Sequence, residues 1–563
     1  MKPSPRCYAS FVAVSLVLSI TSISPASAQS TKRQIGTQFE VTADPVVPRP
    51  HIKPCTVQLF SGFTFAHFSD TAQTFPFTPP TNCSGPWQKV VLEINFSENG
   101  GVQFDRTASM YIANTDVYFG TTPEPLAVDT NTWHVERDIT DYASLMAMPQ
   151  TGTIVLANCT DDCAPPFNTL NGVFTVNADL EFYPANDGHD RRGIADMVLP
   201  LEQVNSTGGI NLPATLTLPT DQLSTTFTLP TNVERAYLDV VSQSQSTDEQ
   251  WYACFPNDLA NINEVYGCGN TDFRETEVTI DGQPAGLAPV SPWVYTGFLP
   301  DQWVPSPGIQ TLDFVPYRVD LTPFAGVLSD GNPHTVALSV FNDDGYFSDT
   351  ASLLLYLDKG SKQVTGAVTN NTLAAPNPVV TENLQGTSTV TGTIGVVSDR
   401  HFNIAGYVNT SHGRVTTSID GHQDFSSTQD IDFDTVNATV LDQKTSVKNK
   451  VSTVTTAVNH GGTVVTHNDY SFPIRVDFIF PVSSALFGFT VTTAQDYQDN
   501  VRVFHDGQLH RFNSITDSGH ATDVGSGRSE QEYTQFNSSG RFYDCKIASK
   551  SATLAQVSSG CSP

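Results

Sequence analysis

Basic residues are scarce in this chain of 563 residues. It has 28 lysines and arginines against 57 aspartates and glutamates, so its formal charge is −29 at pH 7. A nucleic-acid-binding protein shows the opposite balance, because its cationic side chains neutralise phosphates. The composition therefore argues against nucleic acid as a partner. It is compatible with work in acid, where few basic groups limit positive self-repulsion, and equally with simple solubility.

The chain also lacks a long apolar run. A segment that crosses a bilayer needs about 20 apolar residues, and no stretch of that length occurs. The apolar run at 11–20 follows Lys2 and Arg6 and precedes Ala-Ser-Ala at 26–28. This order is typical of a secretory signal, so residues 1–28 are expected to be removed and the protein to be exported, outside the cell or into a periplasm.

The usual metal and enzyme signatures are missing. There is no C-x-x-C pair, no H-E-x-x-H, no G-x-S-x-G elbow, no P-loop and no G-x-G-x-x-G after a strand. These absences argue against a zinc site, a serine hydrolase of the elbow type and nucleotide chemistry. Hydrolysis by a carboxylate-activated water remains open, and it needs a carboxylate with a neighbouring cation.

Nine cysteines are present, and Cys7 lies in the expected signal. The others form sequence-local couples. They are Cys55 and Cys83, Cys159 and Cys163, Cys254 and Cys268, and Cys545 and Cys561. An even set in an oxidising compartment predicts disulfides, and we expect each cysteine to pair with its neighbour, although other connectivities are possible.

Alternating apolar and polar residues predict an all-β fold. The pattern is clear at 89–96, 236–241 and 335–341, and charged residues make up only 15% of the chain. More than one sandwich is needed for a chain of this length. From about residue 374 the composition changes and becomes rich in Ser, Thr, Val and His, which favours a third β-rich unit.

A sequence pattern that occurs twice in the chain indicates duplication of a sandwich. The segment at 133–145 resembles that at 316–328, since each has Asp-Ile/Leu-Thr followed by an aromatic residue and a leucine. Asp138 and Asp320 are expected to bind backbone amides where a strand turns into a short helical corner. The aromatic and leucine side chains would then fill the core.

Two charged pairs and an aromatic loop carry residues suited to chemistry. Asp105 and Arg106 stand side by side, so they would point to opposite faces of an ideal strand and could serve one site only at a bend or strand end. Arg274 and Glu275 follow the loop between two cysteines, and aromatic and proline residues cluster at 293–305. The alternatives are structural: the charged pairs could be ordinary surface charges, and the aromatic loop could fill the open end of a sandwich.

Taken in order, these strings resemble the peptide:N-glycanase A family. The first half contains Phe104-Asp105-Arg106, Thr122-Pro-Glu124-Pro, Trp133 and Asp138-Ile-Thr-Asp-Tyr. The second half contains Phe273-Arg274-Glu275, Ile280-Asp-Gly, Tyr295-Thr-Gly, Trp303 and Asp320-Leu-Thr-Pro-Phe. No single string is specific, but their ordered series is, and it runs from Phe39 to Asp358.

The resemblance implies that the protein is an exported amidase and that it is an acid-active bacterial member of the family. Its substrate would be the amide that joins asparagine to the first N-acetylglucosamine of N-glycosylated peptides and glycoproteins. The fold implied is two jelly-roll-like sandwiches, at 29–195 and 196–365, followed by a β-rich domain at 366–563. No cofactor or metal is expected, and the sequence does not set the oligomeric state.

The resemblance also assigns catalytic roles. A fainter similarity to the bacterial F-type glycanases puts their catalytic aspartate on Asp105 and an adjacent arginine on Arg106. Arg318 becomes a second candidate cation near Asp105. The second carboxylate of that family falls on Asn270, so Glu275 is the best substitute. If Asp105 is to stay ionised in acid, a neighbouring arginine should lower its pKa.

The remaining assignments concern the sugar. Glu124 or Glu275 would bind the first N-acetylglucosamine, Trp303 could stack on it, and Arg274 belongs to the binding set. The loop after Tyr295 reads Thr-Gly-Phe where plant members have Thr-Gly-Gly, so contacts there are expected to differ. A glycan-binding protein without catalysis, a glycoside hydrolase and a cell-surface adhesin remain as alternatives.

Overall fold

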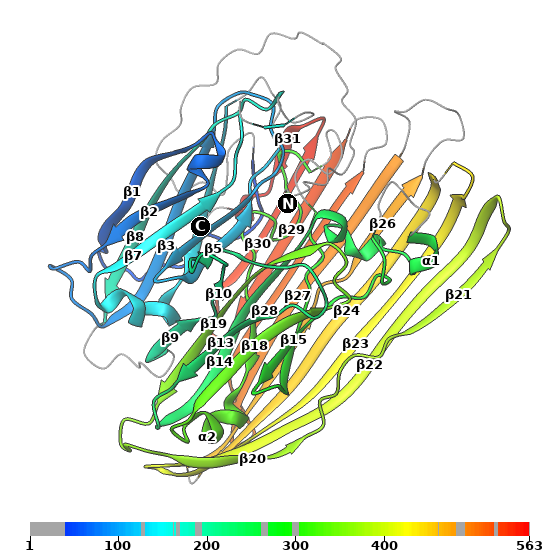
Figure 1. Ribbon diagram of the computed structural model, residues 1–563. Coiled ribbons are helices and arrows are strands. Elements are labelled where there is room, and N and C mark those ends of the chain that lie inside the picture. Colours follow the sequence, from blue (N-terminus) through cyan, green and yellow to red (C-terminus); the bar gives the residue numbers. More distant parts are fainter. Residues whose placement is uncertain are drawn as a thin grey trace.

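The computed structural model gives an all-β molecule (Figure 1). It describes residues 40–124, 130–160, 163–164, 169–185, 194–260, 268–294, 303–437, 439–459, 461–479, 490–522 and 527–561. The expected signal at 1–28 and the loop after Tyr295 lie outside these residues. Among the helices that are described, none is long and apolar enough to cross a membrane.

The first sandwich consists of two antiparallel sheets. One has the order β1-β8-β3-β6, and its strands are β1 (Cys55–Phe65), β8 (Phe174–Pro184), β3 (Trp87–Glu98) and β6 (Asn131–Asp138). The other has the order β2-β7-β4-β5, with β2 (Ala72–Phe77), β7 (Gln150–Leu156), β4 (Thr107–Ile112) and β5 (Thr115–Thr121). The faces that meet are lined by aromatic residues such as Phe75, Phe96 and Trp133. Their burial holds the two layers together.

The second sandwich repeats this topology. Its first sheet has the order β12-β19-β14-β17, formed by β12 (Ala214–Leu216), β19 (Tyr346–Leu357), β14 (Val233–Gln245) and β17 (Tyr317–Asp320), with β9 (Met197–Pro200) beside β19. Its second sheet has the order β13-β18-β15-β16, formed by β13 (Leu223–Thr228), β18 (Pro333–Phe341), β15 (Glu275–Ile280) and β16 (Gln283–Pro289). Numbered from its own first strand, each sandwich reads 1-8-3-6 and 2-7-4-5, the order of a jelly roll. The expected all-β fold class is therefore confirmed, and the two sheet pairs have the strand order expected of jelly rolls.

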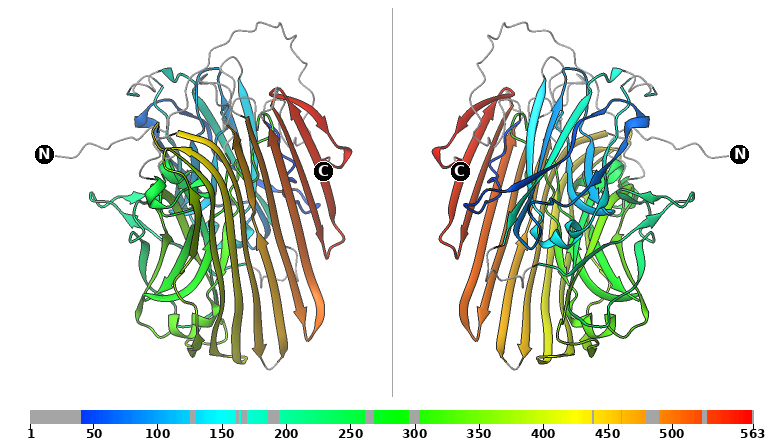
Figure 2. Two further views of the ribbon diagram at one scale, coloured as in Figure 1. Left: turned by 90° about the vertical axis from the view of Figure 1, so that its right-hand side faces the viewer. Right: turned by 90° about the vertical axis from the view of Figure 1, so that its left-hand side faces the viewer.

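The C-terminal region forms one 12-stranded antiparallel sheet. Its strands are β20 (Thr365–Asn371), β21 (Val379–Gln385), β22 (Thr389–Thr410), β23 (Gly413–Asp434), β24 (Thr439–Asn459), β25 (Gly462–Ser471), β26 (Ile474–Ile479), β27 (Thr490–His505), β28 (Gln508–Thr522), β29 (Arg528–Asn537), β30 (Phe542–Lys550) and β31 (Thr553–Val557). One face packs on the second sandwich, where Phe402 and Phe425 share a core with Trp251 and Phe273. Figure 2 shows the long strands lying alongside the sandwiches. The alternate residues of these strands face solvent.

Short helical segments and a small hairpin complete the described elements. They are η1 (Phe68–Asp70), η2 (Thr140–Ala147), η4 (Ser246–Asp248), η5 (Trp251–Ala253), η6 (Thr322–Phe324), η7 (Ser559–Cys561), α1 (Asn257–Ala260), α2 (Ala325–Leu328), β10 (Gln203–Val204) and β11 (Ile210–Asn211).

The two predicted corners are confirmed. At the end of β6 the Asp138 carboxylate accepts bonds from the backbone N–H and the hydroxyl of Thr140, at 3.1 and 2.5 Å. At the end of β17 the Asp320 carboxylate accepts the N–H of Thr322 at 2.9 Å. Each corner leads into a short helix, η2 or η6, whose aromatic residue is buried.

The predicted disulfides are also confirmed, because each cysteine is bonded to its sequence neighbour. The four bonds are Cys55–Cys83, Cys159–Cys163, Cys254–Cys268 and Cys545–Cys561. The last one fastens the C-terminal segment to β30. Val41 and Ala43 pack against the same part of β30, so the two ends of the described chain meet there.

Candidate active site

Asp105 lies at the end of a strand, which is the position it needs if it is to serve the same site as Arg106. Both residues precede Thr107, the first residue of β4. The backbone N–H of Arg106 donates to the hydroxyl of Thr122 at 2.8 Å, and the N–H of Thr122 donates to the carbonyl of Arg106 at 2.8 Å. Because β4 and β5 are antiparallel, Glu124 just beyond β5 comes to the same end of the hairpin as Asp105.

The Arg106 guanidinium is fixed beside Asp105. It lies over the ring of Phe104, 4.6 Å from the centroid, and donates to the Asp105 carbonyl and to Oε1 of Gln103, each at 3.2 Å. The amide of Gln103 is itself held, because its Nε2 donates to Oδ1 of Asn158 at 2.8 Å. The cation is thus held in place before any substrate arrives.

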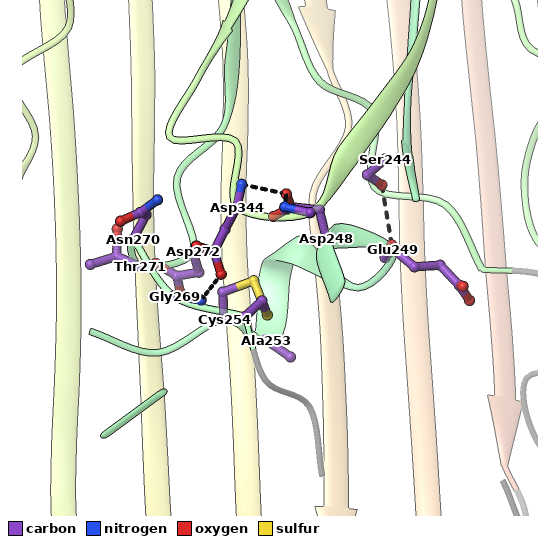
Figure 3. Close-up of a disulfide and its surroundings, with 12 residues drawn as sticks. Ser244, Asp248, Glu249, Ala253, Cys254, Gly269, Asn270, Thr271, Asp272 and Asp344 are labelled. Carbon is purple, nitrogen blue, oxygen red and sulfur yellow. Dashed lines mark hydrogen bonds between the residues drawn. A yellow bond between two sulfur atoms is a disulfide. The ribbon is translucent and has the colours of Figure 1, made fainter. Parts of the chain in front are cut away.

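A carboxylate of the second sandwich joins this cluster. The end of β14 contacts the start of β4, where Thr107 donates to Oε1 of Gln243 at 2.9 Å and accepts from Nε2 of Gln245 at 3.0 Å. Beyond β14 the chain turns through η4 to Glu249, whose carbonyl accepts the hydroxyl of Ser244 at 3.2 Å. Figure 3 shows the Glu249 side chain extending away from the disulfide. The site therefore draws on both sandwiches.

The four carboxyl groups of the cluster differ in proton affinity. Burial raises the pKa of Asp105 to about 6, and the charge of Arg106 opposes the rise. Burial, and then the negative charge of Asp105, raise the pKa of Glu124 to about 8. Burial and the charges of Asp105 and Glu124 raise the pKa of Glu249 well above its usual range. Burial also raises the pKa of Glu98, the last residue of β3, to about 8.

At pH 7 these values leave Asp105 mostly ionised, and Glu98 and Glu124 mostly protonated. Carboxyl groups whose environments push their pKa values apart can act as base and acid in one reaction. Arg106 does lower the pKa of Asp105, as expected, but the cost of burying the carboxylate is larger, so the pKa lies above its usual value. The groups of possible metal ligands found among the described residues lie outside this cluster.

Arg274 and Glu275 lie elsewhere in the second sandwich. Arg274 is fully buried, and its Nε and Nη2 donate to Oδ1 of Asp248 at 2.9 and 2.6 Å. Glu275 is buried at the start of β15, where it forms an ion pair with Arg400 of β22. Burial raises the pKa of Glu275 to about 7, and Arg400 opposes the rise. The structure thus brings Arg274 close to the element that carries Glu249, and Glu275 to the C-terminal sheet.

Arg318 and Trp303 also have structural neighbours. Arg318 donates to both oxygens of Asp239, at 2.7 and 2.8 Å, and to Oδ2 of Asp141 in the first sandwich at 2.6 Å. It therefore links the two sandwiches. Trp303 has no exposed surface and packs towards Gly519 of β28, so in this structure it presents no face to a sugar.

Sequence reasoning missed Glu98 and Glu249. Glu98 follows Ile94 and Phe96 on the inward face of β3, so a carboxylate at a core position was the signal available. The signal for Glu249 is tertiary, because only the contact between β14 and β4 brings it to Asp105.

Two jelly rolls in series, with four carboxyl groups of raised pKa where their strand ends meet, define a paired-sandwich protein whose polar site lies between the sandwiches. Residues 45–373 match the family model described as peptide N-acetyl-beta-D-glucosaminyl asparaginase amidase A. The chain belongs to this family.

A curated relative and two solved structures are similar to the chain. The relative is peptide-N4-(N-acetyl-beta-glucosaminyl)asparagine amidase A of Prunus dulcis, 30% identical over 401 residues, which cover 67% of this chain. The chain spans 66% of that relative's length. PNGase F of Flavobacterium meningosepticum matches with a TM-score of 0.35 and 14% identity, over 54% of this chain and 96% of the other. A structure of PNGF-II matches with a TM-score of 0.37 and 13% identity, over 54% and 65%.

Proposed function

We propose that this protein is an exported amidase that hydrolyses the bond between asparagine and the first N-acetylglucosamine of N-linked glycans. Membership of the amidase A family supports the reaction, and the name of the almond relative supports the substrate. The observation that carries the proposal for this chain is the meeting of Asp105, Arg106 and Glu124 at one end of the β4–β5 hairpin, where burial raises the pKa of both carboxyl groups. The four disulfides favour an oxidising compartment and hence export.

In the proposed mechanism Asp105 is the base. Its carboxylate takes a proton from a water molecule, and the oxygen of that water attacks the carbonyl carbon of the asparagine side chain. Arg106 stabilises the negative charge on Asp105 before the attack and on the carbonyl oxygen during it. A proton from Glu124 or Glu249 goes to the departing nitrogen as the C–N bond breaks. The products are an aspartate-containing peptide and a glycosylamine, which loses ammonia in water.

The proposed pH range is weakly acidic to neutral. Asp105 must be ionised, so activity rises as the pH passes about 6. Glu124 must keep its proton, so activity falls as the pH passes about 8. A substrate that adds a hydrogen bond to the Asp105 carboxylate would extend activity further into the acid range.

The test is the mass of the products from one defined glycopeptide. An amidase of this kind leaves the intact glycan free and converts the asparagine to aspartate, with one oxygen derived from labelled water. A glycoside hydrolase leaves a sugar on the peptide, and a glycan-binding protein leaves the peptide unchanged. Either of these results contradicts the proposal, and the variant Asp105→Asn provides the inactive control.

A further inference from the structure

Two histidines and an aspartate meet on the outer face of the C-terminal sheet, remote in sequence from the residues of the candidate active site. His401 and His422 are direct cross-strand partners of β22 and β23. Their rings stack with centroids 3.9 Å apart and an angle of 11° between the planes. Asp399 lies two residues before His401, on the same face of β22 because side chains alternate along a strand.

The three side chains bring one ligand atom each into a small region. Nε2 of His422 lies 2.9 Å from Oδ1 of Asp399, and Nε2 of His401 lies 3.7 Å from the same oxygen. The three ligand atoms all lie within 4.8 Å of one another. Two nitrogens at about 2.0–2.1 Å from a tetrahedral ion are roughly 3.3 Å apart, so the two rings must rotate out of their near-parallel stacking for both nitrogens to face one ion.

We propose that Asp399, His401 and His422 form a surface site for a divalent transition-metal ion of the zinc or copper type. Imidazole nitrogen with one carboxylate oxygen is a donor set that such ions prefer, whereas magnesium and calcium prefer oxygen alone. All three side chains are solvent-accessible, with exposed fractions of 58%, 74% and 36% for Asp399, His401 and His422, so an ion can enter and water can complete its coordination.

Two other groups of possible ligands are already engaged. In the first, Arg49 forms ion pairs with Glu93 and Glu136, which adjoin His134. In the second, Asp358 accepts the backbone N–H and hydroxyl of Ser411. The site on β22 and β23 differs, since the polar side-chain contacts found for Asp399 among the described residues are those with the two histidines.

Charged groups on the same face of the neighbouring strands shape the local field. Asp420 and Asp424 lie on either side of His422 along β23 and add negative charge. Lys448 and Lys450 of β24 add positive charge, and Lys448 is paired with Asp424.

The experiment is calorimetric titration of the chelator-treated full chain with zinc ions at pH 7.5. The wild type should bind one equivalent at this site, and a rise in Tm should accompany it because the metal binds the folded state. His401→Gln and His422→Gln should each weaken this binding at least about tenfold. Changing a residue that only hydrogen-bonds to a metal ligand already weakens metal binding by about that factor. Both residues are on the surface, so Tm without metal should be unchanged.

The matched control is the double variant His505→Gln, His510→Gln. These two rings also stack, at 4.2 Å and 14°, but among the described residues they have no third ligand close by. Retained binding in the control, with loss in the His401 and His422 variants, supports the site. Absence of saturable binding in the wild type, or equal loss in the control, overturns it.

Discussion

Arg274 and Asp248 form an ion pair in which both side chains are fully buried. The other oxygen of Asp248 accepts the N–H groups of Asp344 and Gly345, at 2.7 and 2.6 Å, and Figure 3 shows the bond to Asp344. Since Asp248 precedes Glu249, this network holds η4 and with it the carboxyl group that the second sandwich contributes.

Breaking this ion pair should destabilise the protein strongly. In Arg274→Met, Asp248 is left as an uncompensated buried charge, a change that costs about 3–5 kcal/mol. Arg475→Ala is the control, because Arg475 pairs with Asp477 at the surface and 62% of its side chain is exposed. Such a pair contributes about 0–1 kcal/mol. Denaturant unfolding measures both variants, and equal losses would contradict a special role for Arg274.

The dependence of kcat/KM on pH should be bell-shaped. The rising limb should lie near pH 6, where Asp105 loses its proton, and the falling limb near pH 8, where Glu124 loses its own. Glu124→Gln keeps the shape of the side chain but cannot ionise, so it should remove the falling limb if Glu124 is the group that titrates there. A falling limb that persists unchanged would assign it to Glu249 or Glu98.

Glu249→Gln tests whether the second sandwich takes part in the chemistry. Loss of a positioned acid typically costs about 10²–10⁴-fold in rate, so kcat should fall by that amount with little change in Tm. Glu530→Gln, an exposed residue of β29, is the matched control and should leave kcat unchanged. A Glu249→Gln variant with a normal rate would confine catalysis to the first sandwich.

The protein should be more stable in weak acid than in weak base. Burial raises the pKa of Asp44 to about 6, that of Asp313 to about 7, and that of Asp517 well above its usual range. Each group binds its proton more tightly in the folded state, so its contribution to stability is complete below about pH 4. The contributions of Asp44 and Asp313 are lost as the pH rises through about 6 and 7, and that of Asp517 is lost as the pH rises through its own raised pKa.

Thermal unfolding at several pH values checks this dependence. Asp517→Asn should flatten the decline of Tm towards pH 8, because the amide oxygen can still accept from Nε2 of Gln531, at 3.0 Å, without carrying a charge. A Tm that rises between pH 5 and pH 8 would contradict the assignment.

Local sequence patterns predicted much of the fold. The alternation of apolar residues predicted the strands, and the repeated Asp-Ile/Leu-Thr strings located both corners. The neighbouring cysteines predicted the disulfides. The sequence did not reveal that the last twelve strands form a single sheet, because the register between strands such as β22 and β23 depends on long-range pairing.

The candidate site was only partly visible. Asp105, Arg106 and Glu124 are close in sequence and joined by one hairpin, so a motif could bring them together. Arg274 shows the limit of such reasoning. It precedes β15, the counterpart of β4 in the second sandwich, yet its neighbours are the buried Asp248 and backbone carbonyls. Its role depends on burial, which no motif records.

The rate at which Asp105→Asn releases glycan from a defined glycopeptide tests the central claim most directly. The amide has nearly the shape of the carboxylate but cannot accept the proton of the attacking water. The variant should keep the Tm of the wild type and its affinity for the glycopeptide, while its rate falls by about 10²–10⁴-fold. Release at the wild-type rate would show that Asp105 is not the base.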